Sequence, residues 1–365
     1  MNSSLQLLVT LTGVTLLFGC AQANGTMEGA ARQALRLCRG RAALLPPVFF
    51  LLAALLAMVG PGAILSTALL APFAMNTGFR AGVPPFLIAL MVGNGANAGN
   101  MSPFSTVGAI VSALMTQEGL GGHEFRVWFF HGAAHLMLAI AAYVLFGGLT
   151  LFRKGSAESV PAPPRMQPHH ALTLLITALW IAGVAFLRWP LGWSAFGAAA
   201  LILLLRLASP KRAIVHMPWK IIALVVGIST AVSFIEKAGG LAWFQQLLAR
   251  LATPESVHGI IAFLTGAISA YSSTSGVVLP AFLPLAPGLA AHLPGVDPLA
   301  LSISIIIGSA LVDVSPLSTL GALCVAAAPE GSHRSALFRN LMIWGLAMAF
   351  VGAAICYLWA PLFSV

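Results

Sequence analysis

The sequence predicts an all-α polytopic membrane protein that contains inverted repeats, two re-entrant helical hairpins and two discontinuous helices. Three observations predict it: a very apolar composition, stretches long enough to cross a bilayer, and a motif that recurs in both halves. Of the 365 residues, 59% are hydrophobic and only 7% are charged, whereas soluble domains carry about 25% charged residues. The formal net charge of +9 comes from basic residues in short stretches between apolar runs, as in cytoplasmic membrane loops. Nucleic acid is therefore not expected as a partner, and the lipid bilayer is.

Eight apolar stretches are each long enough to cross about 30 Å of hydrocarbon. In chain order they are 5–21, 83–115 with an interruption, 126–152, 170–187, 190–207, 221–237, 298–328 with an interruption, and 337–362. The first stretch contains the run Leu17-Phe18-Gly19-Cys20 and so resembles a lipoprotein signal, but it begins without Lys or Arg, so we expect a helix there. The four cysteines show no close pair and indicate neither a disulfide framework nor a zinc cluster. A multi-pass protein of the cytoplasmic (inner) membrane is expected.

Two further apolar regions, 43–77 and 257–291, are each split near the middle. The first break is Gly60-Pro61-Gly62 and the second is the serine- and threonine-rich run 272–276. Each arm is too short to cross the membrane comfortably. We therefore predict helical hairpins that enter the membrane and return to the same side.

A polar, proline-rich linker at 153–169 divides the chain into a first repeat, 1–152, and a second repeat, 170–365. The nonapeptide at 102–110 recurs at 315–323 with six identities and an offset of 213 residues. The hairpin breaks align at nearly the same offset. Such periodicity predicts an internal duplication.

The repeats are predicted to have opposite orientations, because five crossings separate their corresponding first spans. Charge supports this, since the connector 22–42 is basic and its counterpart 236–256 is neutral. The second repeat also begins with two spans that have no counterpart in the first. We therefore expect that at least two N-terminal spans are missing from this chain, so that the first repeat is incomplete at its N-terminus.

Polar residues cluster at the two hairpin breaks and at the two interruptions of the long spans. Unwound backbone at membrane depth is tolerated where it lines a cavity; hydroxyls and amides can replace the water shell of a cation, and helix N-termini can face an anion. The predicted substrate-binding residues are Asn97, Ser102, Ser105, Thr106, Ser272, Ser273, Thr274, Ser275, Ser315, Ser318 and Thr319. The predicted cation-binding residues are Gly60, Gly62, Gly99, Asn100 and Asp313. The alternative is that these small residues only allow close helix packing.

Asp313 is the single acidic residue placed inside a predicted span and away from its ends; the other acidic residues lie in connectors or near span ends. A carboxylate at the bilayer centre costs about 2.5–3.5 kcal/mol on insertion scales, so we expect it to hold Na+ or to exchange a proton. Its counterpart in the first repeat is Asn100. The alternative role for Asp313 is to cap the helix that follows it.

His131 and His135 lie one helical turn apart, a spacing that can bind a metal. With no carboxylate or cysteine nearby on that face, packing at a helix interface is the favoured interpretation. No metal site and no organic cofactor are predicted. An intramembrane enzyme is disfavoured, because no nucleophile and base pair is found at membrane depth.

Four runs resemble the MatC-type dicarboxylate carriers, a malonate carrier group in the divalent anion/sodium symporter branch of the ion transporter superfamily. The runs are Asn24–Thr26, Asn97–Pro103, Tyr271–Pro280 and Asp313–Thr319. The resemblance implies two re-entrant hairpins whose tips hold dicarboxylate and cation, in a transport domain that moves as an elevator against a scaffold. Ser273 stands where those carriers have Asn, and Gly60-Pro61-Gly62 replaces their Ser-Asn-Thr tip.

The expected function is secondary import of a small dicarboxylate, such as malonate, succinate or malate, coupled to Na+ or H+. A homodimer is expected if the missing scaffold spans are present. The alternatives are an antiporter or exporter of the arsenite or Na+/H+ type, and a membrane subunit that works with a separate solute-binding protein.

Overall fold

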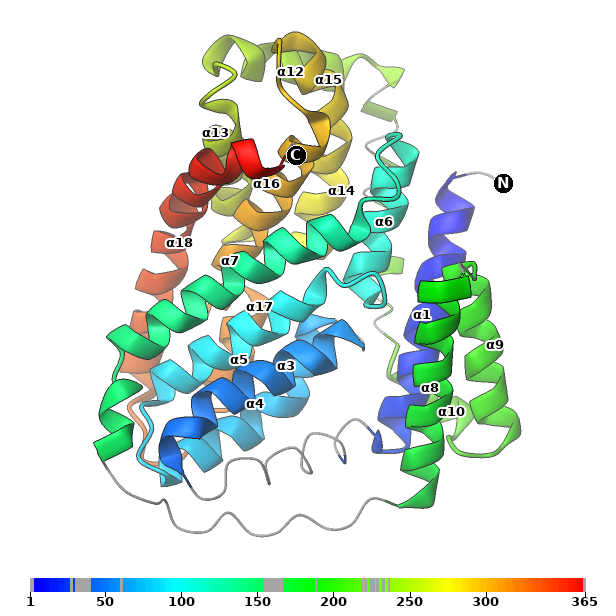
Figure 1. Cartoon of the computed structure of the whole chain (residues 1–365), viewed down its shortest axis with the longest axis vertical. Coiled ribbons are helices and arrows are strands. Elements are labelled where there is room, and N and C mark those ends of the chain that lie inside the picture. Colours follow the sequence, from blue (N-terminus) through cyan, green and yellow to red (C-terminus); the bar gives the residue numbers. More distant parts are fainter. Residues whose placement is uncertain are drawn as a thin grey trace.

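The computed structural model describes residues 3–363 except 27–28, 30–40, 60–61, 154–166, 188, 218, 220–221, 224–226, 228–229, 232–233 and 236. The described elements are helical (Figure 1). In chain order the principal ones are α1 (Ser3–Ala23), α3 (Leu45–Met58), α4 (Ala63–Arg80), α5 (Pro85–Asn100), α6 (Thr106–Gln117), α7 (Glu124–Leu145), α8 (Pro168–Leu187), α9 (Leu191–Leu204), α10 (Pro210–Val215), α12 (Gly240–Leu251), α13 (Val257–Ser269), α14 (Leu279–Phe282), α15 (Ala286–His292), α16 (Pro298–Leu311), α17 (Thr319–Ala326) and α18 (Arg334–Phe363). Short pieces join them: η2 (Ala42–Leu44), η3 (Leu149–Arg153), η4 (Thr274–Val278), η5 (Leu283–Leu285) and η6 (Val312–Val314).

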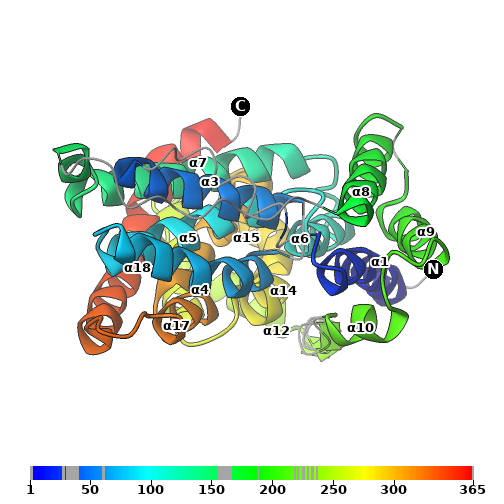
Figure 2. The same ribbon diagram turned by 90° about the horizontal axis from the view of Figure 1, so that it is seen from below.

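The helices form two groups. Helices α1, α8, α9 and α10 lie together beside a larger body that contains α3 to α7 and α12 to α18 (Figures 1 and 2). Small residues bring α1 close to its neighbours: a Cβ on Gly13 would lie 2.3 Å from the Gly192 carbonyl oxygen, and one on Gly19 would lie 2.5 Å from the Ala213 carbonyl oxygen. Contacts between α1 and α6 join this group to the larger body.

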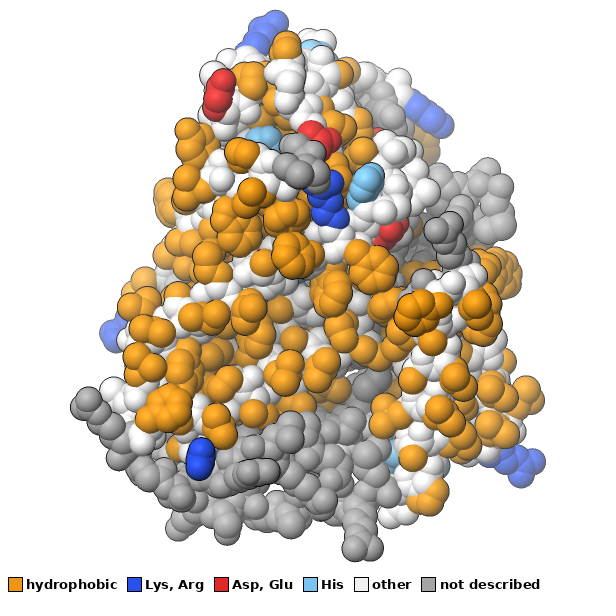
Figure 3. All heavy atoms as spheres, in the orientation of Figure 1, with side chains coloured by type: hydrophobic (Ala, Val, Ile, Leu, Met, Phe, Trp, Pro, Cys, Tyr) orange, Lys and Arg blue, Asp and Glu red, His pale blue; other side chains and the backbone are white. Residues whose placement is uncertain are grey.

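The predicted all-α polytopic class is confirmed. Within the described residues, four helical stretches are long and apolar enough to cross a membrane: Glu124–Leu145, Thr274–His292, Pro298–Ala326 and Arg334–Phe363. On the face seen in Figure 3, the middle of the surface is covered mostly by hydrophobic side chains. Such a surface suits contact with lipid rather than water. The predicted span 221–237 falls partly outside the described residues.

One detail of the predicted hairpins needs correction. The second arm of the 257–291 region, Thr274–His292, is 19 residues long and apolar enough to span, so the expectation that each arm is too short does not hold for it. This arm is assembled from π, α and 3-10 pieces around Pro280, Pro284 and Pro287, because proline interrupts the regular hydrogen-bond ladder. Its partner arm, α13, has 13 residues. The re-entrant path of both hairpins stays a prediction.

Helices α5 and α16 form the centre of the larger body. Every residue of α5 from Leu87 to Asn100 is buried, and so is every residue of α16 from Leu299 to Leu311. Both helices end at an interruption: α5 is followed by a turn before α6, and α16 by η6 and a turn before α17. The two discontinuous helices of the predicted fold therefore bring their breaks into the protein interior.

Glycines allow the hairpins to pack directly against these two helices. A Cβ on Gly95 of α5 would lie 2.3 Å from the Phe50 carbonyl oxygen, and a Cβ on Gly308 of α16 would lie 2.3 Å from the Ala262 carbonyl oxygen. Phe50 corresponds to Ala262, and Gly95 to Gly308, at the offsets of 212 and 213 residues found in the sequence. The same glycine contact thus occurs once in each half of the chain.

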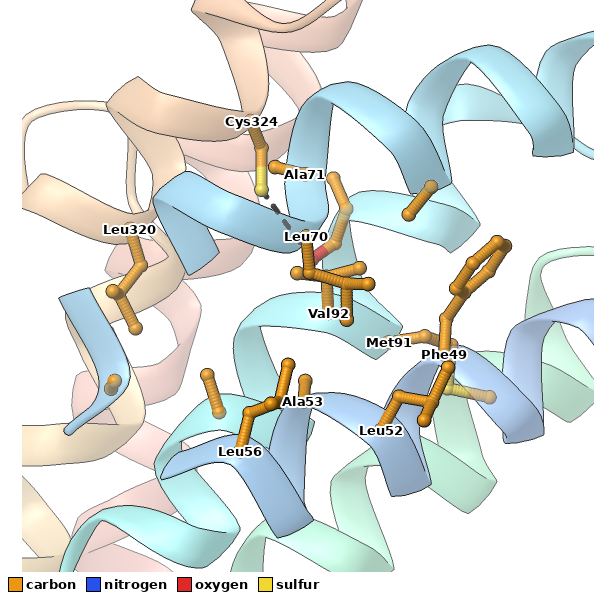
Figure 4. Close-up of a cluster of buried hydrophobic side chains, with 14 of the residues drawn as sticks. Phe49, Leu52, Ala53, Leu56, Leu70, Ala71, Met91, Val92, Leu320 and Cys324 are labelled. Carbon is orange, nitrogen blue, oxygen red and sulfur yellow. Dashed lines mark hydrogen bonds between the residues drawn. The ribbon is translucent and has the colours of Figure 1, made fainter. Parts of the chain in front are cut away.

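Apolar side chains of the first hairpin surround the middle of α5. Phe49, Leu52 and Leu56 of α3 and Leu70 of α4 lie in one buried cluster with Val92 (Figure 4). Helix α17 joins the cluster through Leu320 and Cys324 (Figure 4). Helix α17, although it lies in the second half of the sequence, therefore packs with the first hairpin.

Candidate functional site

Four helical segments begin at one small cavity. These are α4 at Ala63, α6 at Thr106, η4 at Thr274 and α17 at Thr319. Serine caps two of the starts: Ser105 Oγ accepts from the Gly108 N–H at 2.8 Å, and Ser273 Oγ accepts from the Gly276 N–H at 3.1 Å. The four starts come from the two hairpin breaks and the two helix interruptions.

The cavity has a volume of about 30 Å³. Its lining comprises Ala63, Ile64, Asn100, Thr106, Val107, Ser273, Thr274, Ser275, Asp313, Ser318, Thr319 and Leu320. A water needs roughly 10–15 Å³ measured in this way, whereas ligand pockets are typically about 300–1,000 Å³. In this conformation the cavity has room for an ion, a water or one carboxylate group.

Asp313 is the charged group of the cavity and is held by hydroxyls. Its Oδ1 accepts from Thr274 Oγ1 at 2.7 Å and from Ser318 Oγ at 3.1 Å. Ser269 Oγ lies 2.6 Å from Thr274 Oγ1. A carboxylate only accepts hydrogen bonds, so Thr274 donates to Asp313 and Ser269 donates to Thr274. A chain of hydroxyls therefore connects the second hairpin to the break after α16.

Asn100 makes the corresponding connection in the first half. Its Oδ1 accepts from the Ala63 N–H at 2.8 Å, the first amide of α4. Gly62, the residue before α4, has a φ of +83°, a backbone conformation that favours glycine. A Cβ on Gly62 would lie 3.1 Å from Asn100 Oδ1. Asn100 and Asp313 thus each hold the tip of the hairpin from their own half.

The electrostatics of the cavity combine one carboxylate with several helix N-termini. The first residues of α4, α6 and α17 line the cavity, and the positive ends of helix dipoles stabilise anions. No Lys, Arg or His is found among the lining residues. An anionic ligand would meet helix N-termini and hydroxyls, while a cation would meet the carboxylate.

Thr106 adds an unused polar group. Its side chain is 3% exposed, and its Oγ1 has no hydrogen-bond partner within the described residues. A buried hydroxyl left without a partner costs about 1–3 kcal/mol. Since Thr106 lines the cavity, a polar ligand there would recover this cost.

Half of the predicted site residues lie on this cavity. Those predicted to bind substrate are Thr106, Ser273, Thr274, Ser275, Ser318 and Thr319, and those predicted to bind cation are Asn100 and Asp313. Their roles stay predictions.

Four predicted serines lie outside the lining because their hydroxyls serve the local backbone. Ser272 Oγ donates to the Ile268 carbonyl at 2.9 Å. Ser102 and Ser315 each accept at 3.3 Å from the N–H two residues later. Ser105 caps α6. These four stabilise the turns that shape the site.

The four remaining predicted residues also lie away from the lining or outside the described residues. Asn97 Nδ2 donates to the Ala310 carbonyl at 3.1 Å, which ties α5 to α16. Gly99 packs against α3, where a Cβ would lie 2.1 Å from the Ala54 carbonyl oxygen. Gly60 lies outside the described residues. Gly62 lies beside Asn100, behind the tip, rather than on the lining.

The sequence did not identify four apolar or small lining residues, Ala63, Ile64, Val107 and Leu320. Each lies one or two residues after a polar break, at the beginning of a helix. Which side chain faces the cavity depends on how each helix is rotated about its axis at its first turn. The residues of the breaks do not predict that rotation.

His131 and His135 are fully buried in α7, with ring centroids 4.6 Å apart. His131 Nε2 lies 2.9 Å from the Asn97 carbonyl oxygen, and His135 Nδ1 lies 3.0 Å from Asn94 Oδ1. The two histidines therefore fasten α7 to the polar stretch of α5, which agrees with the favoured interpretation of helix packing. They do not line the cavity.

Comparison with known proteins agrees with this architecture. The model of a family described as citrate transporter, CitMHS, matches residues 2–308. Nineteen solved chains match. One is a crystal structure of the Alcanivorax borkumensis YdaH transporter, described as having an unusual topology, with 16% sequence identity, a TM-score of 0.62, and coverage of 97% of this chain and 85% of that chain. No curated protein matches.

The family match over residues 2–308, together with apolar helices long enough to cross a membrane and a fold similar to that of a solved transporter, identifies a polytopic membrane transporter rather than an enzyme. The chain belongs to the citrate transporter family. The family match ends at Gly308 in α16, so it includes both hairpins and the first helix break but not Asp313.

Proposed function

We propose that the chain is a secondary active transporter that imports a small dicarboxylate or tricarboxylate across the cytoplasmic membrane together with Na+ or H+. The malonate, succinate and malate class comes from the resemblance of the sequence to dicarboxylate carriers, and citrate comes from the description of the family. The main support is the cavity where Asp313 and its hydroxyl donors meet the N-termini of α4, α6 and α17.

Charge balance favours coupling to a cation. The cavity offers a carboxylate and no basic side chain, so a dianion that entered alone would face like charge in a low-dielectric environment. A cation bound at Asp313 removes that repulsion. The helix N-termini then supply favourable potential for the ligand carboxylate.

The size of the cavity implies a conformational step. Its volume of about 30 Å³ accepts a small ion but not a whole dicarboxylate. Ligand entry therefore requires that the hairpin tips at Ala63 and Thr274 separate from the helix breaks. We propose that cation and ligand bind in a more open conformation and that this conformation closes around them.

The test is uptake of radiolabelled malonate, succinate, malate and citrate into proteoliposomes that contain the purified protein. An imposed Na+ gradient or proton gradient is applied separately, with ionophores that collapse each gradient as controls. We expect accumulation of at least one carboxylate with one of the two gradients. If neither gradient drives uptake of any of them, the proposed function is wrong.

A further inference from the structure

We propose that a crevice between α4 and α17 is the aqueous vestibule through which the carboxylate ligand reaches the site from one side of the membrane. We propose also that the corresponding interface between α6 and η5 is the closed path on the other side. This inference rests on the proposed transport function and adds an entry route, a ligand-contacting arginine and a conformational state.

The crevice is far larger than the site cavity. Its volume is about 730 Å³, compared with about 30 Å³ at the site, and it falls within the range of about 300–1,000 Å³ that ligand pockets occupy. The lining comprises Ala68, Pro72, Asn76, Phe79 and Arg80 of α4, and Leu323, Ala326, Ala327, Ala328, Pro329 and Glu330 in and after α17. A small carboxylate fits in it whole.

The crevice ends one helical turn from the site. On α4, Ile64 lines the site cavity and Ala68, four residues later, lines the crevice. On α17, Leu320 lines the site cavity and Leu323 lines the crevice. Four residues of α-helix rise about 6 Å, so the barrier between the two spaces is a single layer of side chains.

The polar residues of the crevice indicate that it contains water rather than lipid. Arg80 and Glu330 are exposed and line it together with Asn76, and charged side chains avoid hydrocarbon. The Arg80 guanidinium can bind a carboxylate in a bidentate manner. Glu330 offsets part of the positive charge of Arg80, so that a carboxylate ligand binds there weakly and can dissociate.

The corresponding interface in the other half is filled with apolar side chains. At the offset of 213 residues, Leu323 corresponds to Ile110 and Ala327 to Leu114. Ile110 and Leu114 are 0% and 2% exposed and share a buried cluster with Leu283 of η5. Leu323 and Ala327, by contrast, are partly exposed. One interface is open and its counterpart is closed, as alternating access requires.

Cysteine labelling tests the proposal. In a variant whose native cysteines Cys20, Cys38, Cys324 and Cys356 are replaced by alanine, single Ala327→Cys and Leu114→Cys variants are reconstituted and treated with a charged, water-soluble maleimide. We expect Ala327→Cys to react faster by on the order of tenfold, because the buried position reacts only after local opening. Ala200→Cys, exposed on apolar α9, serves as the control and should react only with a lipid-soluble maleimide.

Equal reactivity at the two positions, or reaction of Ala327→Cys only with the lipid-soluble reagent, would overturn the proposal. A second variant tests the proposal without Leu114→Cys, in case that variant folds poorly. Ala68→Trp places an indole in the crevice and should abolish both labelling of Ala327→Cys and carboxylate uptake, whereas Ala200→Trp should leave both unchanged. Uptake unaffected by Ala68→Trp would also overturn the proposal.

The two proposals fail in different ways. Labelling is measured without ligand, so a clear contrast between Ala327→Cys and Leu114→Cys with no ion-driven uptake of any carboxylate would reject the transport function alone. Ion-driven uptake without the labelling contrast would reject the vestibule alone.

Discussion

Asp313 is the residue at which the two structural parts of the site meet, because it accepts hydrogen bonds from a hairpin hydroxyl and from a hydroxyl at a helix break. Thr274 and Ser318 both donate to Oδ1. This arrangement differs from the helix cap considered as the alternative role, since the side-chain hydrogen bonds found for Asp313 come from hydroxyls rather than from backbone N–H groups. A cation site therefore agrees better with the contacts than a cap does.

Replacing Asp313 with Asn keeps the size of the side chain and removes its charge. We expect Asp313→Asn to abolish the stimulation of uptake by the ion gradient, because the amide cannot balance a cation. The measurement is gradient-driven uptake in proteoliposomes. Asp297→Asn, at the N-cap of α16 and away from the cavity, should keep the stimulation. Retained ion dependence in Asp313→Asn would leave the residue with a structural role only.

A substitution at Thr274 tests the chain of hydroxyls that runs from Ser269 through Thr274 to Asp313. Thr274→Val has nearly the same shape but no donor for Asp313 and no acceptor for Ser269. We expect the KM for the carboxylate to rise on the order of tenfold, which corresponds to ~1.4 kcal/mol. Thr116→Val, near the exposed end of α6, is the control and should leave KM unchanged. An unaltered KM in Thr274→Val would exclude the hydroxyl chain from binding.

At the scale of elements, the site depends on how closely the hairpins approach α5 and α16. The glycines at 95 and 308 permit contact of helix backbones, and this contact carries the hairpin tips to Asn100 and Asp313. Backbone approach of this kind replaces the hydrophobic driving force that soluble helices use, because lipid is as apolar as the side chains.

Gly308→Ala should therefore destabilise the protein by about 1–3 kcal/mol through overpacking, since its Cβ would lie 2.3 Å from the Ala262 carbonyl oxygen. The measurement is thermal unfolding in detergent. Gly197→Ala in α9 is the matched control: a Cβ there meets nothing within 4 Å, and alanine favours the helix by about 0.8–1.0 kcal/mol. If both variants unfold at the same temperature, close packing at Gly308 is not what holds the hairpin.

The sequence predicted where the helices break better than it predicted which side chains in the breaks face the cavity and which bond to the protein itself. Gly, Pro, Ser and Asn in an apolar region mark backbone that leaves the helix, and the repeat paired the breaks. Whether Ser102 faces a ligand or its own turn depends on one hydroxyl rotation, and whether Asn97 faces the cavity depends on the position of Ala310 in another helix. Such choices follow from tertiary contacts that the local sequence does not encode.

At the scale of the whole molecule, the group formed by α1, α8, α9 and α10 lies to one side of the body that holds the site (Figure 2) and contacts it through α1 and α6. The resemblance to dicarboxylate carriers implies a transport domain that moves against a scaffold. We therefore expect the interface of α1 and α6 to move during transport, whereas the glycine contacts of α5 and α16 stay fixed.

A disulfide trap across this interface examines that movement. Cysteine pairs introduced between α1 and α6, in a variant without native cysteines, should stop uptake when oxidised and restore it when reduced. Pairs placed between α3 and α5, within the larger body, should leave uptake unchanged in both states. Full activity of the oxidised α1–α6 pairs would mean that the two groups do not move relative to each other.

The central claim is that two hairpin tips and two helix breaks form one binding site for a carboxylate and a cation. The most direct measurement is a structure of the protein in lipid nanodiscs with a transported carboxylate and its coupling ion. The account predicts ligand density among Thr106, Ser273 and Ser318, with the cation or proton site at Asp313. Ligand density elsewhere, with this cavity unchanged at its present size, would contradict it.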